Sequence, residues 1–288
     1  MKAEDYLAKM DACVARMPQL PPTIGKIMAI CNDPQGSPAE LNRAISIDPV
    51  LTARVLKLIN SAYYGMRQEI SSLVRAVVML GMNTIKNLAL SSAIMSTMGK
   101  HRRFGNLDPT HFWRHCLGVG AVCRTIAQTR GIPSGEQEEF FIMGLLHDLG
   151  KILLNSCFTD DYGRLLSSGE SAPDPLHVRE SKLFGRDHAA VGRMILERWN
   201  LRSRVAAAVG GHHDPLAPEF RQDEAAAVVA VADDYVNYCR VGNSGAQAVT
   251  DLQPELLGVL GLDHEFFQSQ RERLLKEIAL AMVFLEVQ

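Results

Sequence analysis

Proline directly after a helix-capping residue recurs along this chain, and this feature restricts the fold more than any other. Pro38, Pro49 and Pro109 each follow a serine or an aspartate, and Glu40 stands where the glutamate of a capping box is expected. Proline is favoured at the first helical position because the N–H that it lacks has no intrahelical partner there. The sequence therefore predicts that helices begin at these three positions.

Apolar residues recur at helical spacing through most of the chain, whereas alternating segments joined by hairpin turns are hard to find. We therefore predict an all-α fold. Amphipathic runs of this kind cover residues 138–154, 187–199, 202–211, 224–240 and 263–285.

The 288 residues suffice for one large domain or two modest ones. The segment from Gly99 to Asn106 is polar, basic and flanked by glycines, which is typical of a boundary. We expect one helical subdomain over residues 1–105 and a second, with a C-terminal helical extension, over 106–288. The basic cluster around Arg102 in this boundary could contact an acidic partner, but we interpret it as a solvated loop.

The net charge and the composition of the N-terminus argue against nucleic-acid-binding, secreted and membrane proteins. The formal net charge of -2 gives no general positive field for phosphate neutralisation, so we do not expect nucleic-acid binding, although Arg193, Arg198, Arg202 and Arg204 could form a basic stripe. The N-terminal ten residues lack the basic end and apolar stretch of a signal peptide. We expect no membrane span and a cytoplasmic location.

The six cysteines contain no CxxC pair and no dense framework of the kind that small secreted domains use. We therefore expect them to be reduced and mostly packed. Cys116 and Cys123 lie at helical spacing beside His115, and we interpret them as core residues.

Four residues that interrupt apolar helical stretches carry the first chemical signal. His147 and Asp148 are adjacent in an apolar run, while His115 and Asp233 each interrupt a different hydrophobic helix face. Burying such groups without partners is costly. One metal ion between them would provide that partner.

A second group consists of His188 and the adjacent pair His212 and His213, which follows two glycines. Imidazole and carboxylate ligands suit Fe, Mn, Zn or Ni rather than Ca or Mg. We predict one or two divalent transition-metal ions, with Asp148 bridging if two are bound. Any one of these histidines alone would more simply be a packed or capping residue, but seven such residues in order favour a metal site.

The order of these residues resembles the HD superfamily of metal-dependent phosphohydrolases. The segment from His147 to Lys151 is similar to the HDxGK motif of the HD-GYP phosphodiesterases, and the three later histidines resemble their extended ligand set. This resemblance implies that Lys151 and Asp148 act in catalysis, with Lys151 binding phosphate. The GYP signature is absent after His213.

The N-terminal half resembles the HDOD family. The motifs that carry the likeness are Leu20–Ile24, Asp48–Thr52, Asn60–Gly65 and Val77–Gly81, and it continues to His213. The resemblance implies an HD-like C-terminal subdomain and a role in bacterial signal transduction, in a family that generally lacks the full catalytic ligand set. This chain keeps those ligands.

Two functions follow from these features. We favour a regulatory protein whose metal ties helices together and whose partners are signalling proteins or a small nucleotide-like ligand. The alternative is an active phosphohydrolase, either a phosphodiesterase or a nucleotide phosphatase. The apolar stretch over residues 251–288 could pack on its own domain or form a homodimer.

Overall fold

The structure is a computed structural model that describes residues 3–99, 104–169, 172, 174–221, 223–245 and 251–287. Every regular element within these ranges is a helix, which confirms the predicted all-α fold. The helices are α1 (Ala3–Ala15), α2 (Pro22–Asn32), α3 (Pro38–Ser46), α4 (Pro49–Ile59), α5 (Leu73–Gly99), α6 (Pro109–Thr129), α7 (Ser134–Leu146), α8 (Leu149–Cys157), α9 (Thr159–Ser167), α10 (Leu176–Phe184), α11 (His188–Arg198), α12 (Ser203–Gly211), α13 (Ala225–Tyr238), α14 (Pro254–Val259), α15 (His264–Ser269), α16 (Arg271–Ala281) and α17 (Val283–Glu286).

The three helix starts predicted from proline are present. Ser37 and Glu40 form a complete capping box at α3. The carboxylate of Asp48 accepts the N–H of Leu51 at 2.9 Å at the start of α4, and Asp108 caps α6 in the same way. These local bonds satisfy N–H groups that the helices leave without intrahelical partners.

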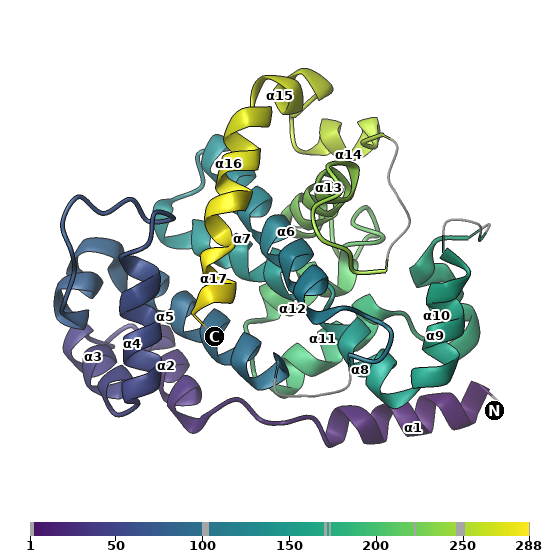
Figure 1. Cartoon of the computed structure of the whole chain (residues 1–288), viewed down its shortest axis with the longest axis horizontal. Helices are drawn as coiled ribbons and strands as arrows, with labels where there is room; N and C mark the ends of the chain where they lie inside the picture. Colours follow the sequence, from purple (N-terminus) through teal and green to yellow (C-terminus); the bar gives the residue numbers. More distant parts are fainter. Residues whose placement is uncertain are drawn as a thin grey trace.

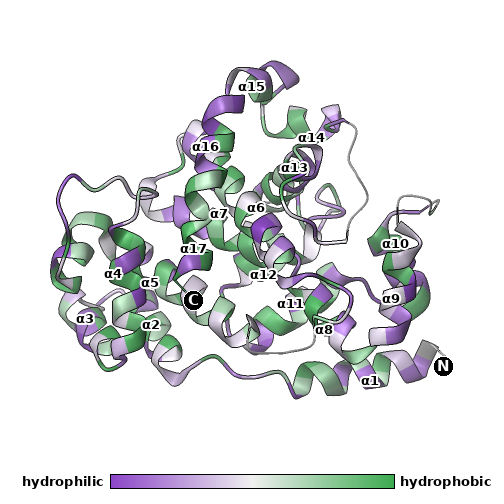
Figure 2. Cartoon of the chain, in the orientation of Figure 1, coloured by the Kyte–Doolittle hydropathy of each residue, from purple (hydrophilic) through white to green (hydrophobic). Residues whose placement is uncertain are grey.

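Helices α2 to α5 gather on one side of the molecule, α6 and α7 lie at its centre, and α8 to α11 lie on the other side (Figure 1). Their buried side chains form one continuous hydrophobic cluster, and hydrophobic residues occur in helices throughout the molecule (Figure 2). Helix α16 packs along α6. Its Leu274 and Ile278 are buried in this core, so the C-terminal stretch packs on its own chain.

Helix α1 crosses to the other side of the molecule, where it packs against α8, α10 and α11 (Figure 1). The hydroxyl of Tyr6 donates to Asp161 at 2.9 Å, and its ring meets that of Phe184 edge-on at 5.3 Å. The first helix of the chain thus supports helices that are far away in sequence. The division into subdomains at residue 105 stays a prediction.

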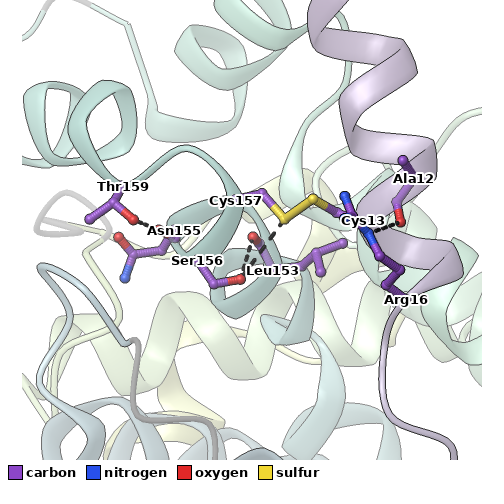
Figure 3. The surroundings of a disulfide bond; sticks show 8 residues. All are labelled: Ala12, Cys13, Arg16, Leu153, Asn155, Ser156, Cys157 and Thr159. Carbon is purple, nitrogen blue, oxygen red and sulfur yellow. Dashed lines mark hydrogen bonds between the residues drawn. A yellow bond between two sulfur atoms is a disulfide. The ribbon is translucent and has the colours of Figure 1, made fainter.

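A disulfide joins Cys13 of α1 to Cys157 at the end of α8 (Figure 3). Their Cα atoms lie 6.6 Å apart although 144 positions separate them in sequence. The prediction that all six cysteines are reduced is therefore wrong for this pair, because the contact arises only when α1 packs on α8. Cys31, Cys116, Cys123 and Cys239 are free, and the predicted burial of Cys116 and Cys123 is confirmed.

Two stretches, Leu73–Gly99 and Ser134–Cys157, are long and apolar enough to pass a length and composition test for a membrane span, contrary to our expectation. The buried share of their apolar windows is 56% and 89%, respectively. The second stretch therefore lies mostly within the core, whereas the first also exposes Val74, Val78 and Met79.

Two facing glycines allow α6 and α7 to approach closely. A Cβ atom added to Gly144 would lie 2.7 Å from the Cα of Gly120, a separation that real Cβ atoms essentially never show. Because the obstacle is backbone, only a movement of one whole helix could relieve the clash. This close packing sets the distance between His115, on α6, and His147, just beyond α7.

Gly144→Ala is therefore expected to destabilise the protein by about 1–3 kcal/mol, as overpacking of a tight core does. The matched control is Gly25→Ala on α2, where an added Cβ meets nothing within 4 Å and alanine should stabilise the helix slightly. Urea unfolding of both variants measures the difference. Equal stability of the two variants would contradict the close-packing argument.

Candidate metal centre

The structure brings all the predicted site residues together at helix ends and on the inner faces of two helices. His147 and Asp148 occupy the junction between α7 and α8, so the run over residues 138–154 is two helices rather than the one predicted. His188 begins α11, and Gly211 ends α12 directly before the histidine pair. The remaining members of the group are His115 on α6, Lys151 on α8 and Asp233 on α13.

His115, His147, Asp148 and Asp233 form one group, which we call the inner site. The Nε2 atom of His115 lies 3.0 Å from Oδ1 of Asp233 and 3.4 Å from Nε2 of His147. His147 Nε2 also lies 3.3 Å from Oδ2 of Asp148. Side chains from two separate helices and one helix junction therefore point their ligand atoms at one small volume.

His188, His212 and His213 form a second group, which we call the outer site. Their ligand atoms all lie within 4.8 Å of one another. The Nε2 atoms of His188 and His213 are 2.9 Å apart, and the rings of His212 and His213 have centroids 4.0 Å apart. Three imidazoles that converge in this way suit a transition-metal ion.

Asp148 lies between the two sites. Its Oδ2 atom faces His147 and His115 at 3.3 and 3.7 Å, whereas its Oδ1 atom lies 3.2 Å from Nε2 of His188. Oδ1 is buried and has no hydrogen-bond partner among the described residues. One carboxylate thus offers one oxygen to each site, which is the arrangement expected of a bridging ligand.

Three of the histidines are oriented through Nδ1, which leaves Nε2 facing the site. Nδ1 of His147 is 2.7 Å from the carbonyl of Gly144, and Nδ1 of His212 is 2.7 Å from that of Val209. Nδ1 of His188 is 2.5 Å from a carboxylate oxygen of Glu180. A metal-binding histidine characteristically donates its second ring N–H to a carbonyl or carboxylate.

These observations test whether the residues fit a metal ion. Nε2 of His212 is buried and lacks a hydrogen-bond partner in the described part of the chain. Paired Nε2 atoms lie 3.4 Å apart in the inner site and 2.9 Å apart in the outer site, so that in each site a metal ion could take two ring nitrogens as ligands. The donor set of imidazoles and carboxylates fits one or two divalent transition-metal ions.

Opposite charges dominate the inner site. Burial alone would raise the pKa of Asp148, but His147 and Lys151 hold that pKa well below its usual range. Burial would lower the pKa of His147, yet Asp148 and Asp233 raise it to about 10. Without a metal, His147 therefore carries a proton that balances part of the carboxylate charge.

The two buried histidines of the outer site differ in charge. Burial opposes protonation of His188, but Glu180 and then Asp148 raise its pKa to about 9. Burial, with the charges of His147 and His188 nearby, lowers the pKa of His212 to about 3. His212 is therefore neutral and ready to act as a ligand at physiological pH.

Lys151 is 2% exposed and belongs to the same charge network. Its Nζ atom lies 2.8 Å from Oδ2 of Asp148 and 3.2 Å from Oγ of Ser244. Although burial opposes it, the adjacent Asp148 raises the pKa of this ammonium group. The side chain therefore holds a positive charge beside the carboxylate that faces both sites.

A cavity of about 340 Å³ opens onto the outer site. Its walls include all three outer histidines as well as Lys151 and Asp233, whereas His115, His147 and Asp148 do not line it. The outer site therefore has access to small molecules, whereas of the inner-site residues Asp233 lines the cavity and the other three do not. Catalytic metal sites differ from structural sites by keeping such an open position.

Sequence reasoning missed several residues of this region. Glu180 is fully buried and bonds His188, His177 stacks on His213 with ring centroids 4.0 Å apart, and Asn237 donates to Asp233 at 2.8 Å. The buried residues of α10 are Leu176, Glu180 and Phe184, so Glu180 interrupts the apolar face of this helix at four-residue spacing, and that signal was present in the sequence. His177 is half-buried, and no such spacing marks it.

The arginines that could have formed a basic stripe are engaged in other contacts. Arg193, Arg202 and Arg204 pair with acidic side chains, and Arg198 donates to the carbonyl of Ala15. Their positive charge is thus largely compensated. The basic cluster over residues 101–103 lies outside the described residues.

Comparison with known proteins gives the same fold. A family model described as the HDOD domain matches residues 17–215. An HDOD domain protein of unknown function from Geobacter sulfurreducens is 26% identical with a TM-score of 0.81, and the match covers 98% of this chain and 99% of that one. A candidate phosphohydrolase from Shewanella amazonensis is 23% identical with a TM-score of 0.76, over 97% and 98% of the two chains, a likeness of fold alone.

An uncharacterised protein of Treponema pallidum is 28% identical over 206 residues, or 70% of this chain, but the match spans only 39% of that protein. The family model matches residues 17–215 of this chain. It runs from the N-terminal motifs to both histidines of the pair at the end of α12. Because it covers more than half of the sequence and both halves of the fold, this chain belongs to the HDOD family.

Proposed function

We propose that this protein is a metal-dependent phosphohydrolase that acts on a small phosphoester. The observation that carries the proposal is Asp148, which offers one oxygen to the inner site and the other to an outer site that opens on a cavity of about 340 Å³. When bound there, two metal ions would supply Lewis acids and lower the pKa of water. Because the outer site is open to the cavity, we favour catalysis over a purely regulatory function.

The surrounding residues have roles that follow from their contacts. Lys151 lines the cavity with its ammonium group 2.8 Å from Asp148, so it can attract and hold a phosphate oxygen beside the outer site. Asn237 lines the same cavity and fixes the orientation of Asp233 by donating to Oδ1. His147 at 3.3 Å and Lys151 at 2.8 Å hold the carboxylate of Asp148 in place.

The direct test is a hydrolysis assay on protein purified without affinity metals and then loaded separately with Fe, Mn, Zn or Ni. Nucleoside phosphates, cyclic nucleotides and cyclic dinucleotides are offered as substrates. We expect turnover that a chelator abolishes and that His212→Ala reduces at least about tenfold, since His212 faces the cavity. Two bound ions with no turnover on any substrate would count against catalysis.

A second function, regulation through the same metal centre, is favoured by a polar cluster between the N-terminal helices and α6. Arg124 of α6 lies over the ring of Tyr63 at 4.7 Å and pairs with Glu138 of α7 at 2.9 Å. Tyr64 donates to the same Glu138 at 3.2 Å. A signalling partner bound to the N-terminal helices could therefore shift the two helices that lead to the inner site.

The two functions differ in their response to Arg124→Met. If the protein acts by regulation, this variant should keep its metal and lose the effect of the metal on partner binding. If it acts by catalysis alone, turnover should change little, since Arg124 does not line the cavity.

Metal binding is expected to release protons. His147 and His188, with pKa values of about 10 and about 9, are protonated at pH 7.5 in the metal-free protein, but metal ligands must be neutral. His212, with a pKa of about 3, releases none. We expect release of about two protons per chain and a metal affinity that rises with pH until about pH 10.

Calorimetry in buffers of different ionisation enthalpy counts the released protons. Zero release at pH 7.5, or an affinity independent of pH between 6 and 9, would contradict the charge states assigned to these two histidines.

A further inference from the structure

Glu180 of α10 contacts both the backbone N–H and the Nδ1 atom of His188 through its carboxylate. Its Oε2 atom accepts two bonds from that residue, from the backbone N–H at 2.8 Å and from Nδ1 at 2.5 Å. Its Oε1 atom accepts the hydroxyl of Tyr162 at 2.6 Å. Both oxygens of a fully buried carboxylate are therefore used, and both bonds to His188 converge on the same atom.

The local fold explains how Glu180 reaches His188 from eight positions earlier in the chain. Helix α10 ends at Gly185, which adopts a left-handed conformation with φ of 80°. The carboxylate of Asp187 then caps α11 by accepting the N–H of Ala190. This short turn brings Glu180, in the middle of α10, beside His188, the first residue of α11.

The contact fixes His188 in a way that differs from the other oriented histidines. His147 and His212 take their orientation from backbone carbonyls, which a side-chain substitution leaves in place. His188 takes its orientation from a side chain. Because the backbone N–H and Nδ1 meet one oxygen, the ring plane is held and Nε2 is directed toward Oδ1 of Asp148, 3.2 Å away.

We propose that Glu180 is a positioning residue that makes His188 a ligand of the outer site, so that occupation of the outer site depends on Glu180 and that of the inner site does not. The inference rests on the proposed metal centre but not on catalysis. A carboxylate behind a histidine ligand fixes its tautomer and increases its basicity, and its removal typically costs about 10–100-fold in metal affinity.

The test is manganese binding to Glu180→Gln, with Tyr162→Phe as the matched control. Glutamine keeps the size of the side chain and removes the charge, whereas phenylalanine removes a bond to the same carboxylate and leaves the charge in place. Electron paramagnetic resonance distinguishes a coupled pair of Mn²⁺ ions from a single ion. Equilibrium dialysis gives the affinity of each site.

We expect two coupled ions in the unmodified protein and in Tyr162→Phe, and one uncoupled ion in Glu180→Gln at concentrations that fill both sites of the unmodified protein. If Glu180 serves stability alone, Glu180→Gln unfolds at a lower temperature in its metal-free form and still binds two coupled ions, which overturns the proposal. An unmodified protein that binds no ion at the outer histidines overturns it as well.

Glu180→Asp covers the case in which Glu180→Gln does not fold. The shorter carboxylate keeps the charge but retracts from His188, so we expect outer-site affinity between those of the unmodified protein and the glutamine variant. Unchanged affinity in the aspartate variant counts against positioning. If the manganese results are as expected but the loaded protein hydrolyses nothing, only the proposed catalytic function fails.

Discussion

Asp148→Asn is expected to abolish the paired metal centre and to lower any hydrolysis at least about a hundredfold. This loss is larger than the loss expected when a residue that only hydrogen-bonds to a metal ligand is removed. The amide offers one neutral oxygen where the carboxylate faces His147 at 3.3 Å and His188 at 3.2 Å. Lys151 also loses the anion that lies 2.8 Å from its ammonium group. A buried charge left without its partner costs about 3–5 kcal/mol.

Elemental mass spectrometry and urea unfolding measure the two effects together. The control is Asp214→Asn, because Asp214 is an exposed acid on the wall of the same cavity. It should retain both ions and full stability. Two ions bound to Asp148→Asn as firmly as to the unmodified protein would exclude a bridging role for this carboxylate.

Loss of the Cys13–Cys157 disulfide is the second large effect that we expect. The crosslink closes a loop over 144 positions of sequence, and in the chain-entropy account a loop of that size stabilises the folded state by about 3–5 kcal/mol. A chain in which both cysteines are serine should therefore unfold at a clearly lower urea concentration than the oxidised protein.

Unfolding with and without a reductant provides the same comparison on the unmodified chain. Cys31→Ser is the control, since Cys31 is a free cysteine and its replacement should leave the effect of the reductant intact. Identical midpoints in oxidising and reducing conditions would show that the crosslink contributes nothing to stability.

The sequence predicted the helical class and the residues that converge at the candidate site well because both signals are local. A capping aspartate such as Asp48 acts within one helical turn. His115 and Asp233 were recognisable because each interrupts an apolar helix face, and the structure places their side chains 3.0 Å apart. The order of these residues, rather than any one of them, made the prediction of a metal site specific.

Other features depend on how distant segments pack, and the sequence does not show them. The run over residues 138–154 reads as one helix, but the chain breaks it at Asp148 to present that carboxylate to both sites. Helix α5 likewise contains a kink at Gly81, where φ is 81°. The pairing of Cys13 with Cys157 and the reach of Glu180 to His188 both require the finished tertiary fold.

The bond between α1 and the end of α8 also changes the connectivity of the molecule. Residues 13 to 157 form a closed covalent ring, and the rest of the chain continues from it as two tails. The ring contains His115, His147 and Asp148, whereas the outer histidines lie on the longer tail. A single backbone cut inside the ring would therefore leave one molecule, whose mass increases by one water. A cut between Cys157 and His188 would instead separate the fragment that carries the outer histidines.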